Sequence, residues 1–355
     1  MEMGHIMKGF IFQRSVRYGI LVCVALFFIV KIMRKENKSV PRISRFTSNF
    51  NKHVYVNDEI PYRNRNGLTI DQVQRNESDV VTLARKISLY NNTVLVSVVN
   101  DAYLPFAYSW LCNTKHMNIH RSVLVITTDI ESKMKLNKDW PEVSVFHITL
   151  DIPKGDQEYS HVGYVKIMIR RTEIILSLLK AKIDLLLLEF DYVWFTNPIY
   201  GFQRQAGVDM LVNPVSNTGG SVFNGGLLYM FATERTQALW TKLTAMMKTL
   251  EQYLKDKSDE MAISEGDNDQ TYLSKLIRER YANITYNLLT LDKYSDGQWY
   301  SKSEDERSKL RPLVISNNWI IGNKNKISRA KKWNHWFLNS DGTCDVETVN
   351  KIVYK

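Results

Sequence analysis

Short apolar runs separated by helical segments are the feature that most narrows the fold of this chain. Four of them have the length and side-chain composition of buried strands, and they occupy residues 93–99, 122–128, 143–150 and 183–188. Between them lie stretches with helical spacing of apolar residues, such as 104–115 and 162–180. Strands that are apolar on both faces and joined by helices predict an α/β domain with a mostly parallel, Rossmann-like central sheet.

The net charge needs to be located before it is interpreted. The 355 residues carry 47 Lys plus Arg and 37 Asp plus Glu, a formal charge of +10. Residues 1–45 hold nine basic and two acidic side chains, so +7 of this charge lies there. The remainder is close to neutral, which argues against a globally cationic polynucleotide binder. Hydrophobic and charged fractions of 44% and 24% argue against disorder and against a multi-span membrane protein.

An uncharged apolar run at residues 19–30 predicts a membrane segment near the N-terminus. A cleaved signal peptide is the alternative, but no small-residue cleavage site follows Val30. We therefore expect an uncleaved signal anchor, followed by a linker and a single folded domain. The expected parts are a cytoplasmic tail at 1–17, the transmembrane anchor at 18–33, a stem at 34–78, the folded domain at 79–340 and a C-terminal tail at 341–355.

The orientation of this anchor is ambiguous from charge alone. Three basic residues precede the apolar run and six follow it before position 46, and the positive-inside rule then favours a cytosolic domain. Four N-glycosylation triplets, beginning at Asn37, Asn76, Asn91 and Asn283, favour a luminal one. Of the three cysteines, Cys112 and Cys344 can form at most one disulfide, and their separation in sequence says nothing about proximity.

Two carboxylates follow the fourth apolar run directly. Glu189 and Asp191 are two positions apart, so on an extended chain their side chains share a face. They lie where a buried strand ends, and open α/β folds bind their ligands at that edge of the sheet. Both carboxylates can converge on one divalent cation and, through it, on a diphosphate. A solvated turn is the alternative explanation.

The segments around these carboxylates resemble the nucleotide-diphospho-sugar transferases, most closely glycosyltransferase family 77. LLLLEFDYVWFTNP at 185–198 resembles the DxD segment of that family, and GYVKIMIRRTEIILSLLKAKID resembles the helix before it. VFNGGLLYMF at 222–231, DNDQ at 267–270 and VISNNWIIGNKNK at 314–326 resemble three later motifs in the same order. The similarity extends over residues 91–338.

This resemblance implies a type A glycosyltransferase fold, a nucleotide-sugar donor that is expected to be a UDP-sugar, and a divalent metal, usually Mn²⁺, held by Glu189 and Asp191. Two departures weaken the expected metal site. Glu189 replaces the first Asp of the motif, and Ser316 stands where the family often has a His ligand. With the apolar run, the resemblance also implies a Golgi membrane protein of type II topology with a luminal domain and a glycan or glycoprotein acceptor.

The remaining site residues are predicted from their positions in these motifs. Phosphate contacts are expected from Lys166, Arg170 or Arg171, and Lys324, and uridine and ribose contacts from Val99, Asn100 and Asp101. Sugar contacts are expected from the Asn224-Gly225-Gly226 segment and from Asp269 and Gln270, and the closing segment adds Asn318 and Gly322 as donor-binding residues. We expect Asp191, Asp269 and Gln270 to take part in catalysis. The resemblance implies retention of anomeric configuration, but no residue is identified as nucleophile or base.

Two further functions remain as alternatives. A non-catalytic sugar or nucleotide-sugar binding module on the same fold would explain Glu189 and Ser316. A basic cluster interleaved with tryptophans would suit stacking on nucleic acid bases, although it suits sugars and phosphates equally well. The cluster comprises Lys324, Lys326, Arg329, Lys331 and Lys332, with Trp319, Trp333 and Trp336 around it. We expect no nucleic acid partner, and we expect His335 to be a surface or packing residue.

Overall fold

A seven-stranded sheet forms the centre of the computed structural model, which describes residues 79–353. The strand order is β3-β2-β1-β4-β7-β6-β8, with parallel pairing from β3 to β4, antiparallel pairing of β7 with both of its neighbours, and parallel pairing of β6 with β8. The strands are β1 (Val94–Val99), β2 (Val123–Thr127), β3 (Ser144–His147), β4 (Leu185–Leu188), β6 (Met210–Pro214), β7 (Phe223–Met230) and β8 (Tyr286–Leu288). The predicted α/β class and mostly parallel sheet are confirmed.

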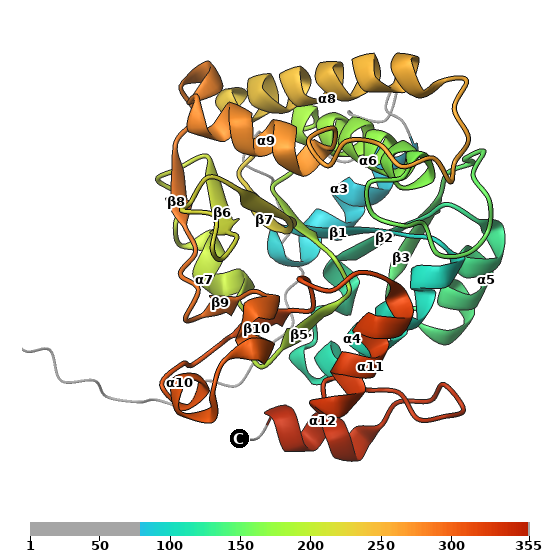
Figure 1. Cartoon of the computed structure of the whole chain (residues 1–355), viewed down its shortest axis with the longest axis vertical. Helices are drawn as coiled ribbons and strands as arrows, with labels where there is room; N and C mark the ends of the chain where they lie inside the picture. Colours follow the sequence, from blue (N-terminus) through green and yellow to red (C-terminus); the bar gives the residue numbers. More distant parts are fainter. Residues whose placement is uncertain (1–78, 354–355) are drawn as a thin grey trace, which may run out of the picture. The chain divides into compact units, whose positions relative to one another are not determined.

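Helices cover both faces of this sheet (Figure 1). On one face lie α3 (Asp79–Asn91), α6 (Val162–Lys180), α8 (Glu234–Leu254) and α9 (Asp269–Arg278), and on the other lie α4 (Leu104–Thr114), α5 (Ile130–Asp139) and the short α7 (Ile199–Gln203). The strands feed both cores by alternation: Leu185 and Leu187 of β4 pack towards α6, whereas Leu186 and Leu188 pack towards α4. This two-sided burial explains why the strands are apolar at nearly every position.

A small second sheet brings a late part of the chain to the end of β4. Its order is β5-β10-β9, formed by β5 (Tyr192–Trp194), β9 (Tyr294–Ser295) and β10 (Val314–Ser316). β10 is antiparallel to β5, with Ser316 opposite Tyr192. Because β5 begins directly after Asp191, this pairing places the segment that follows β10 beside the two carboxylates.

The last described residues pack against the domain. Cys112 in α4 forms a disulfide with Cys344, with 5.4 Å between their Cα atoms. The bond lies just before α12 (Val346–Val353), whose Val349 and Ile352 pack with Phe337 and Cys112. Part of the segment expected as a C-terminal tail is therefore a helix attached to α4.

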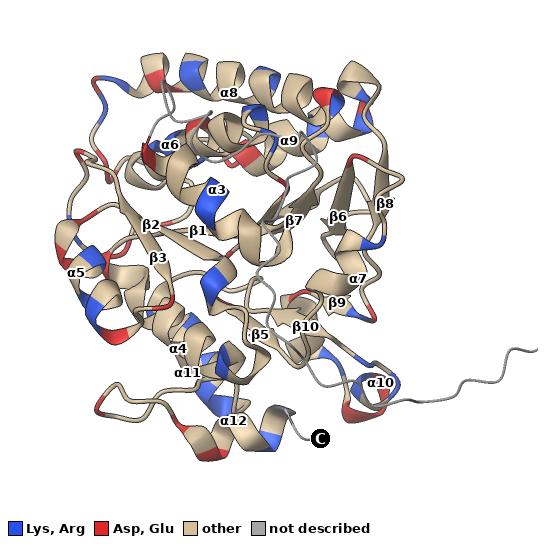
Figure 2. Ribbon diagram, turned by 180° about the vertical axis from the view of Figure 1, so that it is seen from behind, with Lys and Arg blue, Asp and Glu red and all other residues tan. Residues whose placement is uncertain are grey.

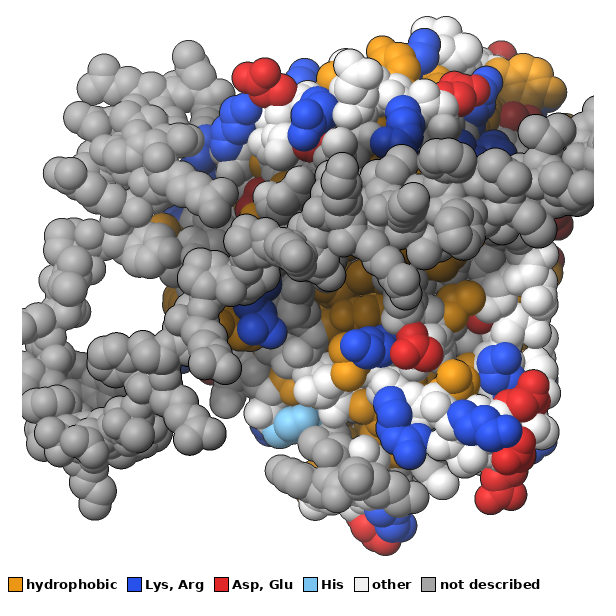
Figure 3. Space-filling view, turned by 90° about the vertical axis from the view of Figure 1, so that its left-hand side faces the viewer, with side chains coloured by type: hydrophobic (Ala, Val, Ile, Leu, Met, Phe, Trp, Pro, Cys, Tyr) orange, Lys and Arg blue, Asp and Glu red, His pale blue; other side chains and the backbone are white. Residues whose placement is uncertain are grey.

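Charged side chains of both signs are spread over the described surface (Figures 2 and 3). The exception is α11 (Asn323–Lys332), which carries five basic residues and whose sequence has no acidic one. The neighbouring α10 (Glu304–Ser308) begins with three consecutive acidic residues. Within residues 79–353, no helix is long and apolar enough to cross a bilayer. The predicted tail, anchor and stem at 1–78 lie outside the described residues.

Candidate active site

The end of β4 carries two acidic residues into the interior of the domain. The Glu189 backbone N–H donates a hydrogen bond to the Gly226 carbonyl (2.9 Å), which extends the β4–β7 pairing by one residue. The Glu189 side chain is 33% exposed, whereas that of Asp191 is 1% exposed. Between them, Phe190 points into the α4 core and packs against Trp110. The chain thus places both carboxylates on one side and a ring on the other, as the spacing predicts.

Arg171 of α6 joins Glu189 to Asp269 at the start of α9. Its guanidinium donates to Glu189 Oε1 (3.2 Å) and to Asp269 Oδ2, and the residue is only 4% exposed. Burial by itself lowers the pKa of Arg171, but the charges of Asp269 and Glu189 outweigh it and raise the pKa. Arg171 is therefore a permanent positive charge beside the carboxylates.

Lys326 of α11 supplies the second positive charge. Its Nζ donates to Asp191 Oδ2 at 2.6 Å, and its side chain is 20% exposed. Burial opposes its charged form, but Asp191 and Glu189 raise its pKa. Lys324, which the sequence favours for a phosphate contact, is exposed on the same helix. Residues two apart on a helix point about 200° apart, so the two lysines face opposite ways.

Burial and the neighbouring Asp191 charge raise the pKa of Glu189, against the opposing effect of Arg171 and Lys326. Burial, and after it the charges of Asp191 and Glu189, raise the pKa of Tyr103, which stacks on Phe106 near the start of α4. Tyr103 is a site residue that the sequence reasoning missed, since no motif includes it. Its position two residues after Asp101, just beyond the end of a predicted strand, was the signal that could have found it.

The Asn224-Gly225-Gly226 segment of β7 lies against Glu189. Gly225 N–H donates to Gln270 Oε1 (3.0 Å), and Gly226 N–H donates to Asn224 Oδ1 (2.8 Å). A Cβ atom on Gly226 would lie 2.6 Å from Glu189 Oε2, which is closer than real Cβ contacts. Glycine at position 226 is what allows β7 to run this close to the carboxylate.

The segment after β10 closes the site from the other side. Asn317 N–H donates to the Asp191 carbonyl (2.9 Å), and Asn317 Oδ1 accepts from Arg329 Nε (2.7 Å). Asn318 Oδ1 accepts from Gly297 N–H (2.6 Å), so its side chain holds the preceding loop. Ser316 is buried, and its Oγ accepts from Asn318 N–H (3.3 Å).

At the end of β1, the residues predicted to hold uridine and ribose first organise a loop. Val99 is buried, as the last residue of the strand. Asn100 Oδ1 accepts from Tyr103 N–H (3.0 Å) and its Nδ2 donates to the Gly155 carbonyl (2.8 Å). Asp101 Oδ1 accepts from Gly155 N–H (3.1 Å). Gly322 has φ +83 and precedes α11, where Asn323 N–H donates to Asp156 Oδ2 (3.0 Å). The loop around 155 therefore links β1 to α11.

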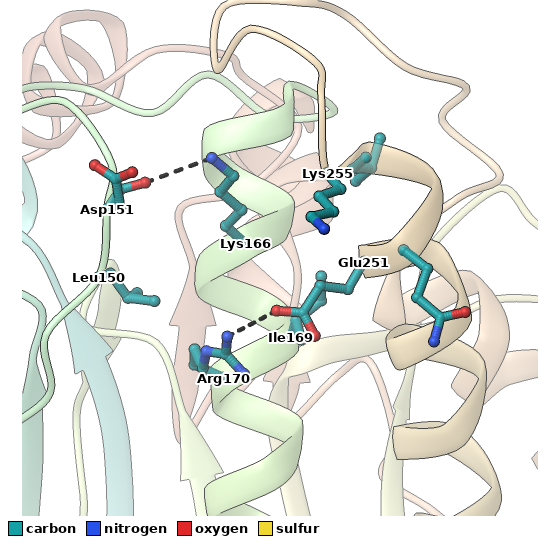
Figure 4. A pocket seen from close by; sticks show the side chains of 9 residues that line it. Leu150, Asp151, Lys166, Ile169, Arg170, Glu251 and Lys255 are labelled. Atoms are coloured by element: carbon teal, nitrogen blue, oxygen red, sulfur yellow. Dashed lines mark hydrogen bonds and ion pairs between the residues drawn. The ribbon is translucent and has the colours of Figure 1, made fainter.

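Lys166 and Arg170 lie on a different face of α6 from Arg171. They line a cavity of about 400 Å³ between α6 and the end of α8 (Figure 4). Lys166 Nζ is 2.8 Å from Asp259 Oδ1, and Arg170 forms 2.7 Å ion pairs with Glu173 and Glu251. Of the three α6 candidates for a phosphate contact, Arg171 is the one that contacts Glu189.

The basic cluster at the C-terminus is partly turned inward. Lys326 contacts Asp191, and the Arg329 guanidinium lies 4.5 Å from the centre of the Tyr300 ring. His335 is buried between Tyr300, Trp299 and Phe195, and burial lowers its pKa to about 3. His335 is thus a neutral packing residue, one of the two roles expected for it.

Glu189 and Asp191 fit a divalent cation. Asp191 Oδ1 is buried and has no hydrogen-bond partner among the described residues, and a carboxylate oxygen is a ligand that Mg²⁺ or Mn²⁺ prefers. Within residues 79–353 there is no group of three or more His, Cys, Asp or Glu side chains placed to hold a metal. Two carboxylates are sufficient where substrate phosphates complete the coordination, as is usual for Mg²⁺.

Comparison with known proteins identifies a family that this chain matches. A family model described as nucleotide-diphospho-sugar transferase matches residues 118–330. Two similar proteins come from Arabidopsis thaliana. UDP-D-xylose:L-fucose alpha-1,3-D-xylosyltransferase 3 is 21% identical, over 72% of this chain and 69% of its own length. UDP-D-xylose:L-fucose alpha-1,3-D-xylosyltransferase MGP4 is 23% identical, over 72% of this chain and 73% of its own length. A UDP-galactose:fucoside alpha-3-galactosyltransferase from Dictyostelium discoideum is 20% identical over 52% of this chain and 30% of its own length.

Among solved structures, glycosyltransferase GlyE of Streptococcus pneumoniae has a TM-score of 0.44 with 13% identity, covering 73% of this chain and 63% of its own. Mouse xyloside xylosyltransferase 1 has a TM-score of 0.39 with 10% identity, and the match covers 66% of this chain and 98% of its own.

The family match contains both carboxylates and their two cationic partners. Residues 118–330 make up more than half of the chain and include Arg171, Glu189, Asp191 and Lys326. The chain is a glycosyltransferase that uses a nucleotide-sugar donor, and it belongs to the nucleotide-diphospho-sugar transferase family.

Proposed function

We propose that this chain, on a type A glycosyltransferase fold, transfers a sugar from a UDP-sugar to a hydroxyl group of a glycan or glycoprotein, at the carboxylates that follow β4. The observation that carries this proposal is the pairing of each carboxylate with a cation, Arg171 being buried and Lys326 partly buried. Arg171 bonds Glu189, and Lys326 bonds Asp191 at 2.6 Å. Buried charges are costly unless they are paired, and such clusters are typical of functional sites.

The arrangement suits the departure of a nucleoside diphosphate. Cleavage of the glycosyl–phosphate bond builds negative charge on the leaving diphosphate, and fixed positive charges stabilise it most where water is excluded. A divalent cation bound by Glu189 and Asp191 would add Lewis-acid stabilisation of the same charge. Lys326 has two further N–H donors beyond its bond to Asp191, and these are available to diphosphate oxygens. Arg171 holds Glu189 and Asp269 in place, and Gln270 fixes Gly225 of β7.

The names of the relatives supply a first choice of substrates. Four Arabidopsis relatives are named as UDP-D-xylose:L-fucose transferases, and the Dictyostelium relative is named as a UDP-galactose:fucoside transferase. We therefore propose UDP-xylose or UDP-galactose as donor and a fucoside as acceptor. Their alpha products support retention of anomeric configuration, because UDP-xylose and UDP-galactose are themselves alpha-linked.

We also propose a type II anchor at residues 18–33 with the catalytic domain in the Golgi lumen. Two features of the described residues support a luminal domain. The Cys112–Cys344 disulfide suits an oxidising compartment, and Asn283, in an Asn-Ile-Thr triplet, is exposed. A mobility shift of the cellular protein after endoglycosidase treatment is expected. An unchanged mobility, with protease access from the cytosolic side, would reverse the proposed topology.

The activity is tested with the full chain in detergent. UDP release is measured with UDP-xylose or UDP-galactose and methyl α-L-fucoside, with and without Mn²⁺. Asp191→Asn removes the negative charge without changing the shape, and we expect a loss of at least about 100-fold, the scale of losing one electrostatic stabiliser. Asp305→Asn, at an exposed carboxylate on α10, is the matched control and should keep full activity. Undiminished release by Asp191→Asn would refute the proposed site.

A further inference from the structure

Trp319 has an unusual backbone conformation and an exposed ring. Its φ is +61°, in the left-handed region, which is a sterically unfavourable conformation for a bulky side chain. The residue is 46% exposed, so the ring is not held there by burial in the core. Strained residues of this kind persist where surrounding contacts enforce them, and they cluster at functional sites.

The contacts that enforce this conformation come from a buried carboxylate. Trp319 Nε1 donates to Asp296 Oδ2 at 2.8 Å, and Asp296 is 2% exposed. Asp296 also accepts from Ser216 N–H (2.8 Å) and Ser216 Oγ (2.9 Å). The indole ring is therefore fixed in orientation by one edge, while about half of the residue's surface remains open to solvent.

Trp319 lies close to the carboxylates. Asn317, two residues earlier, donates its backbone N–H to the Asp191 carbonyl at 2.9 Å. Asn318, which lies between Asn317 and Trp319, packs tightly against Gly297. A Cβ atom on Gly297 would lie 1.9 Å from the Asn318 carbonyl oxygen. The segment from Asn317 to Trp319 is thus held at each of its three residues.

The sheet order separates Trp319 from the residues predicted to contact uridine and ribose. β1, which ends at Asn100-Asp101, is on one side of β4, and β7 and β6 are on the other. Through Asp296, Trp319 is tied to Ser216, which follows β6. The strand that carries the carboxylates, β4, therefore lies between β1 and the strand to which the indole is tied. A second substrate must approach the donor sugar from the side away from the nucleotide.

We propose that Trp319 is the platform on which the acceptor sugar ring stacks, and that the acceptor is of the fucoside class. This inference rests on the proposed function and names a binding residue for its acceptor. The C–H groups on one face of a pyranose are apolar, and a large, fixed aromatic ring can cover them at a small entropic cost. The hydrogen bond to Asp296 sets the angle of this surface before the sugar arrives.

Trp319→Gly in the full chain tests the proposal, because glycine adopts a φ of +61° without strain. The variant keeps the backbone path and removes only the ring. We expect the KM for methyl α-L-fucoside to rise about tenfold or more, the scale of one aromatic stacking contact together with its buried area. The KM for UDP-xylose and the rate of donor hydrolysis without acceptor should stay unchanged. Trp319→Phe, which retains a ring, should recover part of the acceptor affinity.

Tyr253→Ala is the control, since Tyr253 is an exposed aromatic on α8, on the other face of the sheet. Acceptor binding is also measured without turnover, by saturation-transfer NMR on methyl α-L-fucoside. Saturation of the fucoside ring protons should be strong for the native chain and Tyr253→Ala, and weak for Trp319→Gly. Equal saturation, or none, in the native chain and Trp319→Gly would overturn the platform. A rise in donor KM alone would assign the ring to the nucleotide and also overturn it. If saturation differs between the native chain and Trp319→Gly as expected but the native chain releases no UDP, the platform is supported and the proposed function is refuted.

Discussion

At the scale of single residues, the site is a set of buried charges that neutralise one another. Asp191 and Arg171 are each about 4% exposed, and each carries an ion pair. Removing one partner of such a pair leaves an uncompensated buried charge, which is strongly destabilising. The spacing of Glu189 and Asp191 was readable in the sequence, because strand geometry is local. Their cationic partners were not identifiable individually, because the contacts depend on how α6 and α11 are rotated.

Gly226→Ala is predicted to disturb the site through one added methyl group. The new Cβ would lie 2.6 Å from Glu189 Oε2, so the carboxylate or β7 must move. The contacting atom is the end of a flexible side chain, so the shift costs little stability. It displaces the Glu189 carboxylate, however, and we expect UDP release to fall about tenfold or more. Gly201→Ala, at an exposed position of α7, is the matched control, because a Cβ atom there would meet nothing within 4 Å. Equal activity of the two variants in the UDP-release assay would contradict this account.

At the scale of elements, two helices determine which basic residues reach the carboxylates. Adjacent residues on α6 point about 100° apart, so Arg171 faces Glu189 while Arg170 pairs with Glu173 and Glu251. The same argument separates Lys326 from Lys324 on α11. The sequence placed both helices beside the predicted site through motif order, but it did not fix their rotation. That is why it favoured Lys324 and left Arg170 and Arg171 as alternatives.

The two lysines of α11 give a matched pair of variants. Lys326→Gln removes the cation that bonds Asp191, and we predict a loss of about 100-fold or more in UDP release, the scale of one electrostatic stabiliser. Lys324→Gln changes an exposed residue and should stay within about twofold of the native rate, since isolated surface charges contribute little. UDP release by both variants, measured at the same ionic strength, tests which of the two lysines supports the reaction. A larger effect of Lys324→Gln would show that α11 is rotated in the active enzyme.

At the scale of the whole folded domain, the parallel strands β1 to β4 and their covering helices were predictable, because each is a continuous apolar or periodic segment. Two features were not predictable. The antiparallel direction of β7 depends on the route of the chain from β6, and the docking of α12 depends on contacts distant in sequence. Cys112 and Cys344 are separated by 232 positions, so only the fold reveals that they meet.

The disulfide is predicted to stabilise the fold without taking part in chemistry. Cys344→Ser should lower the free energy of unfolding by about 2–5 kcal/mol, because a cross-link over a long loop restricts the unfolded chain. The fall should appear in urea denaturation, and the native chain treated with a reductant should show the same fall. The KM for UDP-xylose should stay unchanged in Cys344→Ser, since the bond lies beside α12. A raised KM would show that α12 supports the donor site.

The ion pairs of the site also imply an order of assembly during synthesis. Arg171 and Glu189 are 18 positions apart and can meet once β4 has joined the sheet, whereas Asp269 is 98 positions from Arg171. Lys326 is 135 positions from Asp191, so it leaves the ribosome last of the partners. Until then the growing chain holds Asp191 without its counter-charge, and the donor site stays incomplete. The nascent enzyme is therefore expected to gain activity only after α11 has been translated.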